Sequence, residues 1–310
     1  MALGAQTTAP RIDARTRIGA VRLTVRDLDR SARFYEQLLG LVPDEQPDGS
    51  LRLGAGYGGP PLLELRADGS APARDPRLTG LYHFAVLVPT RRDLAVSLVR
   101  LSQGRWPLDG ASDHLVSEAL YLSDPDGNGI EIYRDRDRSE WRYDENGQMQ
   151  MATLPLDLRG LVAELDAAPP DPASDASVPA ETRIGHIHLQ VSELRQIEAF
   201  YNGILGFDVI VRSYPGALFV SAGGYHHHIG LNTWNSRGAA APPPGAVGLD
   251  SYEVVFEEPQ ALDEVLQRVH AAGLETGQAP GNGPGGAGEA DGTGGTLVRD
   301  PNGNAVVLTV

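Results

Sequence analysis

The chain has 310 residues, and 41% of them are hydrophobic, which is enough to give two domains of ordinary size their own cores. Its net charge is -15 and no basic cluster stands out, so neither nucleic acid nor an anionic membrane is an expected partner. The sequence contains no cysteine, which excludes disulfides, thiolate metal sites and cysteine nucleophiles. Any bound metal must therefore be held by His, Asp or Glu.

The N-terminal residues do not have the pattern of a targeting segment. No apolar run follows a basic start, and nowhere does an apolar stretch reach the roughly 18 residues that a membrane-spanning helix needs. We therefore predict a cytoplasmic protein with a flexible N-terminal tail over residues 1–16.

Two segments of the chain are similar to each other. IGAVRLTVRDLDRSARFYEQLLGL begins at Ile18 and IGHIHLQVSELRQIEAFYNGILGF begins at Ile184, with F-Y and L-G at the same offsets. In both, alternating apolar residues predict a strand that leads through a potential N-cap, Asp27 or Ser192, into an amphipathic helix. The glycine of each L-G pair suits the end of that helix.

A second pair of similar segments follows the first in each half. GLYHFAVLVP begins at Gly80 and GLDSYEVVFEEP at Gly248, and the matched endings are DPDGNGIEIY from Asp124 and DPNGNAVVLTV from Asp300. The Asp-Pro-x-Gly-Asn stretches predict tight turns that feed a final strand. The chain is therefore expected to have an α+β fold of four βαβββ modules that form two half-barrel domains; the modules cover roughly residues 17–68, 80–136, 183–234 and 247–310.

A Pro/Ser/Asp-rich stretch, DAAPPDPASDASVPAET, separates the second module from the third and predicts a domain boundary. We assign residues 17–140 to an N-terminal domain, 141–182 to a connecting arm and linker, and 183–310 to a C-terminal domain. The Gly-rich stretch from Pro280 to Gly295 is predicted to be a solvent-exposed insertion.

Because the modules are repeats, equivalent positions can be compared within this one chain. Potential metal ligands occupy three repeated positions, and their counterparts in the sister modules cannot ligate: His83, Glu131 and His186 correspond to Ser251, Val307 and Ala20. Glu131 lies within an otherwise apolar strand, where an unpaired carboxylate would be costly, so a cation partner is expected.

These motifs, above all GLYHFAVLVP, ASDHLVSEALYLSDPDGNGIEIYRDR and YHHHIGLNTW, resemble the vicinal oxygen chelate superfamily of glyoxalases, bleomycin-resistance proteins and extradiol dioxygenases, and in particular its tandem catechol 2,3-dioxygenase-like branch. The resemblance covers nearly the whole chain. It implies that a first-strand His and a last-strand Glu from paired modules bind a divalent metal inside a half-barrel. Neither the first module paired with the second nor the third paired with the fourth completes such a set, whereas pairing the second with the third would bring His83, Glu131 and His186 together.

Two histidines and one carboxylate with open positions form the arrangement of non-haem iron(II) oxygenases, so Fe(II) is the expected metal, with Mn(II), Ni(II) and Zn(II) as alternatives. Glyoxalase-like members of the family would have a fourth protein ligand on the last strand of the third module. The matching residue here is Gly230. That position leaves room for a bidentate substrate and dioxygen.

Several other side chains are candidates for the same cleft or are simply structural. His188 shares a strand face with His186 and could transfer protons. In YHHHIGLN, alternation predicts that His226 and His228 face the cleft while His227 points away, and His228 is our candidate acid or base. The remaining candidates are Tyr252 and Tyr133, which could orient a phenolate oxygen, and His114 near the mouth of the cleft.

The leading functional hypothesis is a metal-dependent extradiol ring-cleaving dioxygenase that acts with O2 on a catechol-like vicinal diol. One alternative is a glyoxalase- or epimerase-like metal-dependent lyase or isomerase at the same site. A protein that sequesters a ligand without turnover, as bleomycin-resistance proteins do, is the other. The expected partners are a small aromatic diol and O2, and a homo-oligomer is left open.

Overall fold

Four modules of strand, helix and three strands make up the protein, in a computed structural model that describes residues 10–145, 147–171, 175–279 and 295–310. The first module comprises β1 (Arg17–Val25), α1 (Leu28–Phe34) with its π-helical continuation η1 (Tyr35–Leu39), β2 (Val42–Glu45), β3 (Leu51–Gly54) and β4 (Pro61–Ala67). The second comprises β5 (Gly80–Leu87), α2 (Arg91–Gln103), β6 (Gly110–Asp113), β7 (Ser117–Ser123) and β8 (Gly129–Asp135).

The second half of the chain repeats this order. The third module comprises β10 (Arg183–Gln190), α4 (Leu194–Glu198) with its π-helical continuation η3 (Ala199–Leu205), β11 (Asp208–Val211), β12 (Ala217–Ser221) and β13 (Ile229–Asn232). The fourth comprises β14 (Gly248–Val255), α5 (Pro259–Ala271), β15 (Thr276–Gln278), β16 (Thr296–Arg299) and β17 (Ala305–Thr309). The predicted α+β fold of four βαβββ modules is confirmed.

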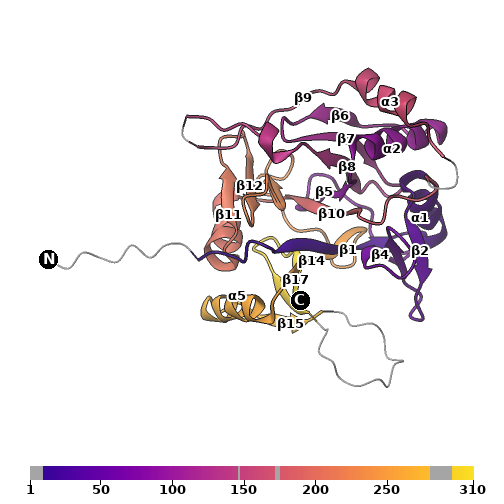
Figure 1. Cartoon of the computed structure of the whole chain (residues 1–310). Coiled ribbons are helices and arrows are strands. Elements are labelled where there is room, and N and C mark those ends of the chain that lie inside the picture. The colour runs from indigo at the N-terminus through magenta and orange to yellow at the C-terminus, as the bar shows by residue number, and fades with distance from the viewer. Residues whose placement is uncertain (1–9, 146, 172–174, 280–294) are drawn as a thin grey trace.

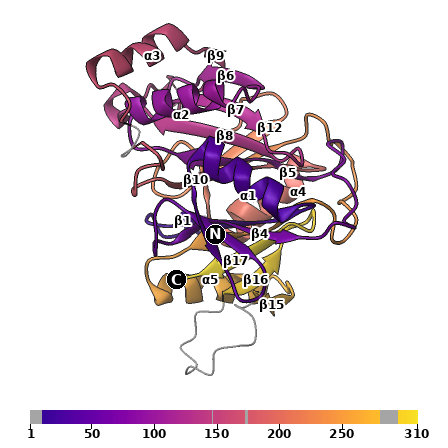
Figure 2. The ribbon, with the colours of Figure 1, turned by 90° about the vertical axis from the view of Figure 1, so that its right-hand side faces the viewer.

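The modules pair across the two halves of the chain. One sheet has the order β11-β12-β13-β10-β5-β8-β7-β6-β9 and the other has the order β15-β16-β17-β14-β1-β4-β3-β2. At the centre of each, the first strands of two modules lie antiparallel, β10 against β5 and β1 against β14 (Figures 1 and 2). The second and third modules therefore share one sheet, and the first and fourth share the other.

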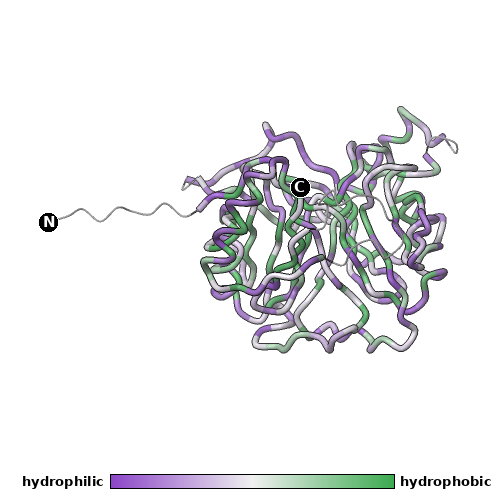
Figure 3. Tube along the Cα trace, turned by 90° about the horizontal axis from the view of Figure 1, so that it is seen from below, coloured by the Kyte–Doolittle hydropathy of each residue, from purple (hydrophilic) through white to green (hydrophobic). Residues whose placement is uncertain are grey.

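The central strands of the nine-stranded sheet are the most deeply buried part of it. β10 is buried along almost its whole length, and β5 and β8 are nearly as apolar, so the central strands carry the core. In Figure 3, hydrophobic stretches run through the strands of both lobes and hydrophilic stretches lie mainly on the outer rim. None of the described helices is long and apolar enough to cross a membrane.

Helix starts follow the sequence in one repeat and differ in the other. Asp27 caps α1 as predicted, and its side chain accepts a hydrogen bond from the backbone N–H of Arg30. In the third module the N-cap is Glu193 rather than the predicted Ser192. Ser192 is held elsewhere, because Asn302 accepts from its backbone N–H and donates to its hydroxyl oxygen.

Residues 10–16, which the sequence assigned to a loose tail, are anchored on the third module. The N–H of Ile12 donates to the carbonyl of Gly206 at 2.8 Å, and the Ile12 side chain is buried. Arg11 forms an ion pair with Asp208. The prediction of a loose tail is thus wrong for this part, and residues 1–9 lie outside the described residues.

The connecting arm packs on the second module. η2 (Arg138–Glu140) precedes the arm, which contains β9 (Leu154–Pro155) and α3 (Leu158–Ala167), and β9 pairs with β6 at the edge of the nine-stranded sheet. α3 lies beside α2, where Arg91 donates to the carbonyl of Gly160 and pairs with Glu164 (Figure 2). The Gly-rich insertion predicted from Pro280 falls on residues 280–294, outside the described residues.

Candidate metal centre and its cavity

Strand register brings His83, Glu131 and His186 together at the centre of the nine-stranded sheet. In the pairing of β10 with β5, His186 lies opposite Ala85, and in the parallel pairing of β5 with β8, Ala85 lies beside Glu131. Glu131 and His186 therefore flank Ala85 on one face of the sheet, and an alanine is too short to separate them. His83, two residues before Ala85, points to the same face.

The three potential ligand atoms meet at short distances in a buried position. Nε2 of His83 lies 3.0 Å and Nε2 of His186 lies 3.1 Å from Oε2 of Glu131, and the two Nε2 atoms are 3.4 Å apart. The three residues are only 6%, 1% and 3% exposed for His83, His186 and Glu131. Among the residues that the structure describes, this is the one group of three His or carboxylate side chains whose ligand atoms lie within 4.8 Å of one another.

Electrostatics leave this group with a charged carboxylate and a neutral imidazole. Burial alone would raise the pKa of the Glu131 carboxyl, but the facing His186 and His83 outweigh it and hold that pKa well below its ordinary value. Burial is the largest influence on His186 and lowers its pKa to about 4. At neutral pH the cluster thus offers a carboxylate oxygen and an unprotonated imidazole, the forms that bind a metal.

The spacing of the donor atoms fits a divalent cation. Two ligand atoms bound to one ion at about 2.0–2.2 Å, with about 90–110° between them, lie roughly 2.8–3.6 Å apart. The three measured separations, from 3.0 to 3.4 Å, fall in this range. The buried convergence of two nitrogens and an anionic oxygen therefore matches what the sequence comparison predicted for a metal site.

Packing, and not a hydrogen bond at Nδ1, supports the ring of His186 behind its ligand atom. Its Nδ1 is buried and meets no hydrogen-bond partner among the described residues. Its ring centroid lies 4.8 Å from that of Tyr133 and 4.1 Å from that of His227. Gly185 makes this possible, because a Cβ there would lie 1.8 Å from the Tyr133 hydroxyl oxygen.

Tyr133 therefore packs behind the ring of His186. The sequence had suggested that Tyr133 orients a phenolate oxygen of the substrate, and this expectation is not met. Its side chain is fully buried, and its hydroxyl lies 2.7 Å from that of Tyr225.

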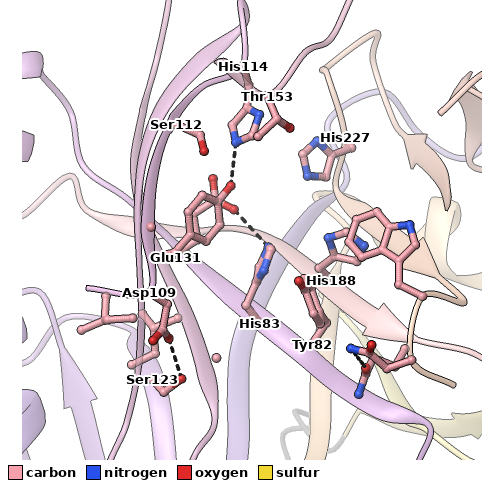
Figure 4. Close-up of a pocket in the computed structure, with 18 of the residues that line it drawn as sticks. Tyr82, His83, Asp109, Ser112, His114, Ser123, Glu131, Thr153, His188 and His227 are labelled. Atoms are coloured by element: carbon pink, nitrogen blue, oxygen red, sulfur yellow. Dashed lines mark hydrogen bonds and ion pairs between the residues drawn. The ribbon is translucent and has the colours of Figure 1, made fainter. Parts of the chain in front are cut away.

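The ligand cluster borders a cavity of about 550 Å³, which His83 and Glu131 line directly. His114, His188 and His227 also line it, and Figure 4 shows these three side chains around His83 and Glu131. The cavity lies on the open side of the cluster, where a small molecule can approach the donor atoms of His83 and Glu131.

Tyr121 is a cavity residue that the sequence reasoning missed. It lies directly opposite Glu131 in the β7–β8 hairpin. Burial, and then the negative charge of Glu131, raise the pKa of the Tyr121 hydroxyl well above its ordinary value, so it stays protonated. The sequence does contain a signal for it, because the predicted Asp-Pro-Asp-Gly-Asn turn folds the strand before it against the strand that carries Glu131.

His114 lies in the cavity as predicted and holds the Tyr121 hydroxyl. One ring nitrogen, Nδ1, lies 2.6 Å from the carbonyl oxygen of Ala152, which can only accept, so Nδ1 carries the proton. The other, Nε2, lies 2.7 Å from the Tyr121 hydroxyl and in the neutral ring accepts its proton. The carbonyl of Ala152, in the connecting arm, thereby fixes the tautomer of a cavity histidine.

The predicted orientation of the three consecutive histidines is wrong. β13 begins only at Ile229, so His226, His227 and His228 lie in the preceding turn, where the two-residue alternation of a strand does not apply. His227 lines the cavity, and His226 and His228 do not. Nδ1 of His228 instead accepts the backbone N–H of Ala222 at 3.1 Å, and burial lowers the pKa of His228 to about 3. A catalytic role for His228 is therefore withdrawn.

His226 connects His227 to a carboxylate. Nε2 of His226 lies 2.8 Å from Oδ1 of Asp135, and Nδ1 of His226 lies 2.8 Å from Nδ1 of His227. Since the carboxylate accepts, the proton of neutral His226 lies on Nε2 and its Nδ1 accepts from His227. Nε2 of His227 is then left without a proton. Burial, and then the neighbouring histidines, lower the pKa of His227 well below its ordinary value.

His188 lines the cavity as expected, on the face that it shares with His186. Its Nε2 accepts a hydrogen bond from the side-chain amide of Asn232 at 3.1 Å. A Cβ at Gly230 would lie 2.8 Å from Cγ of His188, so the residue that stands in place of a fourth ligand is the one that makes room for this ring.

Tyr252, in contrast, lies outside the cavity. It belongs to β14 in the other sheet, and its hydroxyl lies 2.7 Å from that of Tyr201, which donates to Asp300. The predicted role of Tyr252 in orienting a substrate is therefore wrong, because the fourth module pairs with the first and not with the metal centre.

Comparison with known proteins agrees with this fold. The family model described as Glyoxalase/Bleomycin resistance protein/Dioxygenase superfamily matches residues 17–132 and 183–308. The chain is 48% identical over 264 residues to a catechol-2,3-dioxygenase of Bacillus subtilis (strain 168), an alignment that covers 83% of this chain and 89% of that relative.

Solved structures show the same architecture at low sequence identity. One is from Bacillus subtilis subsp. subtilis str. 168 and is described as a candidate dioxygenase, with a TM-score of 0.61, 14% identity, and coverage of 97% of this chain and 86% of that one. Another is glyoxalase I from Zea mays, with a TM-score of 0.53, 16% identity, and coverage of 95% and 92%. With the family model matching most of its length, this chain belongs to the glyoxalase, bleomycin resistance protein and dioxygenase superfamily.

Proposed function

We propose that this protein is a metal-dependent extradiol dioxygenase that cleaves the ring of a catechol-like vicinal diol with O2. The observation that carries the proposal is the cluster of His83, Glu131 and His186, which has two imidazole nitrogen donors, one carboxylate and an open side toward the cavity. The 48% identity to a catechol-2,3-dioxygenase supports the same reaction.

His83, Glu131 and His186 would hold the metal, for which Fe(II) is the first choice and Mn(II), Ni(II) and Zn(II) accept similar ligands. A bound Fe(II) would supply a common site for the diol oxygens and dioxygen and would lower the pKa of a diol hydroxyl. Gly230 favours this chemistry over a glyoxalase-like reaction, because the ring of His188 fills the space of a fourth ligand.

His227 is the group best placed to take a proton from the diol. Its Nε2 lacks a proton, and the ring lies directly against His186. A proton gained at this nitrogen would place a positive charge on His227, and the carboxylate of Asp135, joined to His227 through the hydrogen bonds of His226, would supply the compensating negative charge. His227 thus takes the role of acid or base that the sequence had suggested for His228.

Tyr121 is the complementary group. Its hydroxyl stays protonated and donates its one proton to Nε2 of His114, so toward the cavity it offers its oxygen as an acceptor for a hydroxyl of the diol. His188 stands on the other side of His83, with a ring centroid distance of 5.0 Å, and restricts where a substrate ring can lie.

The test combines metal analysis with oxygen uptake. Protein purified without oxygen and loaded with Fe(II) is expected to consume equimolar dioxygen and catechol. His227→Gln should lower kcat by about 100-fold or more, the usual range for loss of an acid or base, whereas the matched His228→Gln should stay within about twofold. Stoichiometric binding of catechol without oxygen uptake would contradict the proposal and favour a sequestering protein.

A further inference from the structure

The cavity is much larger than a single-ring diol requires. Its volume of about 550 Å³ lies within the range of roughly 300–1,000 Å³ that holds drug-sized ligands. A diol seated against His83 and Glu131 would occupy one region of it and leave the rest to be filled by a substituent or by water. The chemistry of the remaining walls therefore decides what else the substrate carries.

One side of the cavity is built from aromatic rings, which we call the aromatic wall: Tyr82, Tyr214, Phe219 and Trp234. Centroids are 5.5 Å apart for Tyr82 and Trp234, 6.2 Å for Tyr214 and Trp234, and 6.0 Å for Tyr214 and Phe219. Two of these pairs are near perpendicular, at 75° and 83°. Rings packed edge to face leave other ring faces available for a further aromatic group.

Trp234 is the most accessible member of the aromatic wall. Its side chain is 43% exposed although it borders the cavity. Its Nε1 donates to the carbonyl of Pro215 at 2.9 Å, which fixes the plane of the indole. Gly216 leaves space for it, because a Cβ there would lie 3.1 Å from Cδ1 of the indole. An indole held rigidly at the border of a cavity provides a preformed surface for an apolar ligand.

The aromatic wall lies close to the metal centre. Tyr82 precedes His83 in β5, and its ring centroid is 5.4 Å from that of His83 and 5.1 Å from that of His188. In Figure 4 Tyr82 and His188 lie to one side of His83, and Glu131 and Ser112 lie to the other. A substituent on a diol bound at His83 can therefore reach the aromatic wall directly.

The charges around the cavity disfavour an anionic substituent. Among the described residues that line it, Arg74 is the one Lys or Arg. Its guanidinium donates to the carbonyl of Leu81 at 2.7 Å and already lies in the field of Asp124 and Asp75. Asp109 adds a carboxylate to the lining, so the cavity offers an anion little net attraction.

We infer that the substrate is a vicinal diol that carries an uncharged aromatic substituent, and that this substituent packs against the aromatic wall. The inference rests on the proposed function, because the diol is taken to bind at His83, Glu131 and His186. Tyr82 and Trp234 are the residues that select such a substrate over unsubstituted catechol.

Anaerobic binding measurements on the Fe(II)-loaded protein test this preference without turnover. Calorimetry would compare catechol with 3-phenylcatechol, 4-phenylcatechol and 3,4-dihydroxybenzoate. The better of the two phenyl isomers is expected to bind about tenfold or more tightly than catechol, from the burial of one additional ring. The anionic 3,4-dihydroxybenzoate should bind no more tightly than catechol.

A variant assigns the preference to the aromatic wall. Trp234→Leu should remove about three- to tenfold of the phenyl advantage, the usual effect of one ring pair, and leave the Kd of catechol within about twofold. Tyr57→Leu, at an exposed tyrosine in the loop between β3 and β4 of the other sheet, is the matched control and should change no Kd.

The outcomes separate the two proposals. The inference is overturned if catechol is cleaved but neither phenyl isomer binds more tightly than catechol. It is also overturned if Trp234→Leu weakens the binding of all ligands equally. Either result would leave the dioxygenase proposal standing. If neither catechol nor a phenylcatechol binds or is cleaved, the proposed function itself is wrong, and the inference is lost with it.

Discussion

The two sheets arrange the strands of their modules in the same order, but the side chains that fill their interiors differ. In the nine-stranded sheet the central strands carry His83 and His186, and in the eight-stranded sheet the same positions carry Ser251 and Ala20. In the nine-stranded sheet the small side chain of Ala85 lies between two of the ligand residues. The equivalent position in the eight-stranded sheet is occupied by Glu253. The interior of the nine-stranded sheet is thus open between its donor atoms, whereas the interior of the eight-stranded sheet is filled by side chains.

The filled interior supplies its own cation. Arg22 stands at the position of His188, and its guanidinium lies 2.7 Å from Oε1 of Glu253 and 3.6 Å from Oε2 of Glu64. Glu64 in turn stands at the position of Gly230, and Oε2 of Glu253 also accepts the backbone N–H of Ala20 at 3.0 Å.

Both interiors therefore hold buried carboxylates, and a buried carboxylate needs positive charge nearby. In the eight-stranded sheet guanidinium groups of the chain provide that charge, since Arg22, Arg52 and Arg66 lie 3.6, 3.7 and 3.2 Å from the carboxylate of Glu64. In the nine-stranded sheet no Lys or Arg is paired with Glu131 in the described structure, and the two histidines beside it fit a metal ion. The two interiors thus balance their buried carboxylates differently, one with arginines of the chain and the other with two histidines that fit a metal site.

The largest expected effect is loss of the metal from one sheet only. His83→Ala or Glu131→Ala should abolish metal retention, because loss of a direct ligand should exceed the roughly 10- to 100-fold loss of affinity that follows loss of an outer partner. Ser251→Ala and Val307→Ala, at the equivalent positions, should retain the metal. Elemental analysis of desalted protein measures this, and a folded Ser251→Ala variant without metal would show that the two interiors are assigned the wrong way round.

A smaller effect is expected from Arg22. Arg22→Met should lower the free energy of unfolding by about 2 kcal/mol, less than the loss of a fully buried ion pair, since Glu253 keeps partial access to water. Metal content should not change. Urea unfolding measures the stability, and Glu253→Gln added to Arg22→Met should recover part of the loss, because it removes the carboxylate left without its partner. Equal losses in the single and double variants would argue against the guanidinium as an internal cation.

A substitution at Gly230 tests the same comparison in the nine-stranded sheet, which carries the ligand cluster. Gly230→Ala would place a Cβ 2.8–3.0 Å from the ring of His188, so we expect a loss of about 1 kcal/mol and weaker catechol binding, with the metal retained. Gly203→Ala is the matched control, since a Cβ there would meet no neighbouring side chain within 4 Å, and it should be neutral or slightly stabilising. An unchanged Kd for catechol in Gly230→Ala would mean that His188 does not shape the binding region.

The sequence predicted the features that repeats and strand register determine. Four modules and the positions of His83, Glu131 and His186 followed from comparing the chain with itself, because duplication preserves the register of first and last strands. The pairing of the second module with the third followed from the need to complete a ligand set, and the sheet order agrees.

Features that depend on local geometry outside regular strands were not predictable in this way. The alternation rule failed for His227 and His228 because the turn before Ile229 is irregular. Tyr252 was misplaced because its module pairs with the first one. Tyr121 was overlooked because its importance comes from the residue opposite it in the hairpin and from the His114 tautomer that a carbonyl of the connecting arm fixes.

The smallest expected effect concerns the Gly-rich segment in the fourth module. Replacing residues 280–294 by a short Gly-Ser turn should leave metal content unchanged and shift stability by less than about 0.5 kcal/mol. The flanking residues are already paired, since the N–H of Ala279 donates to the carbonyl of Gly295 at 2.9 Å, so a tight turn can join them. β15 and β16, which carry these flanks, form the outer edge of the eight-stranded sheet and belong to the interior that lacks the ligand cluster. Elemental analysis and thermal unfolding of the shortened protein check both expectations. A folded, shortened protein that had lost its metal would show that the fourth module contributes to the centre in the other sheet and that the two interiors are not independent.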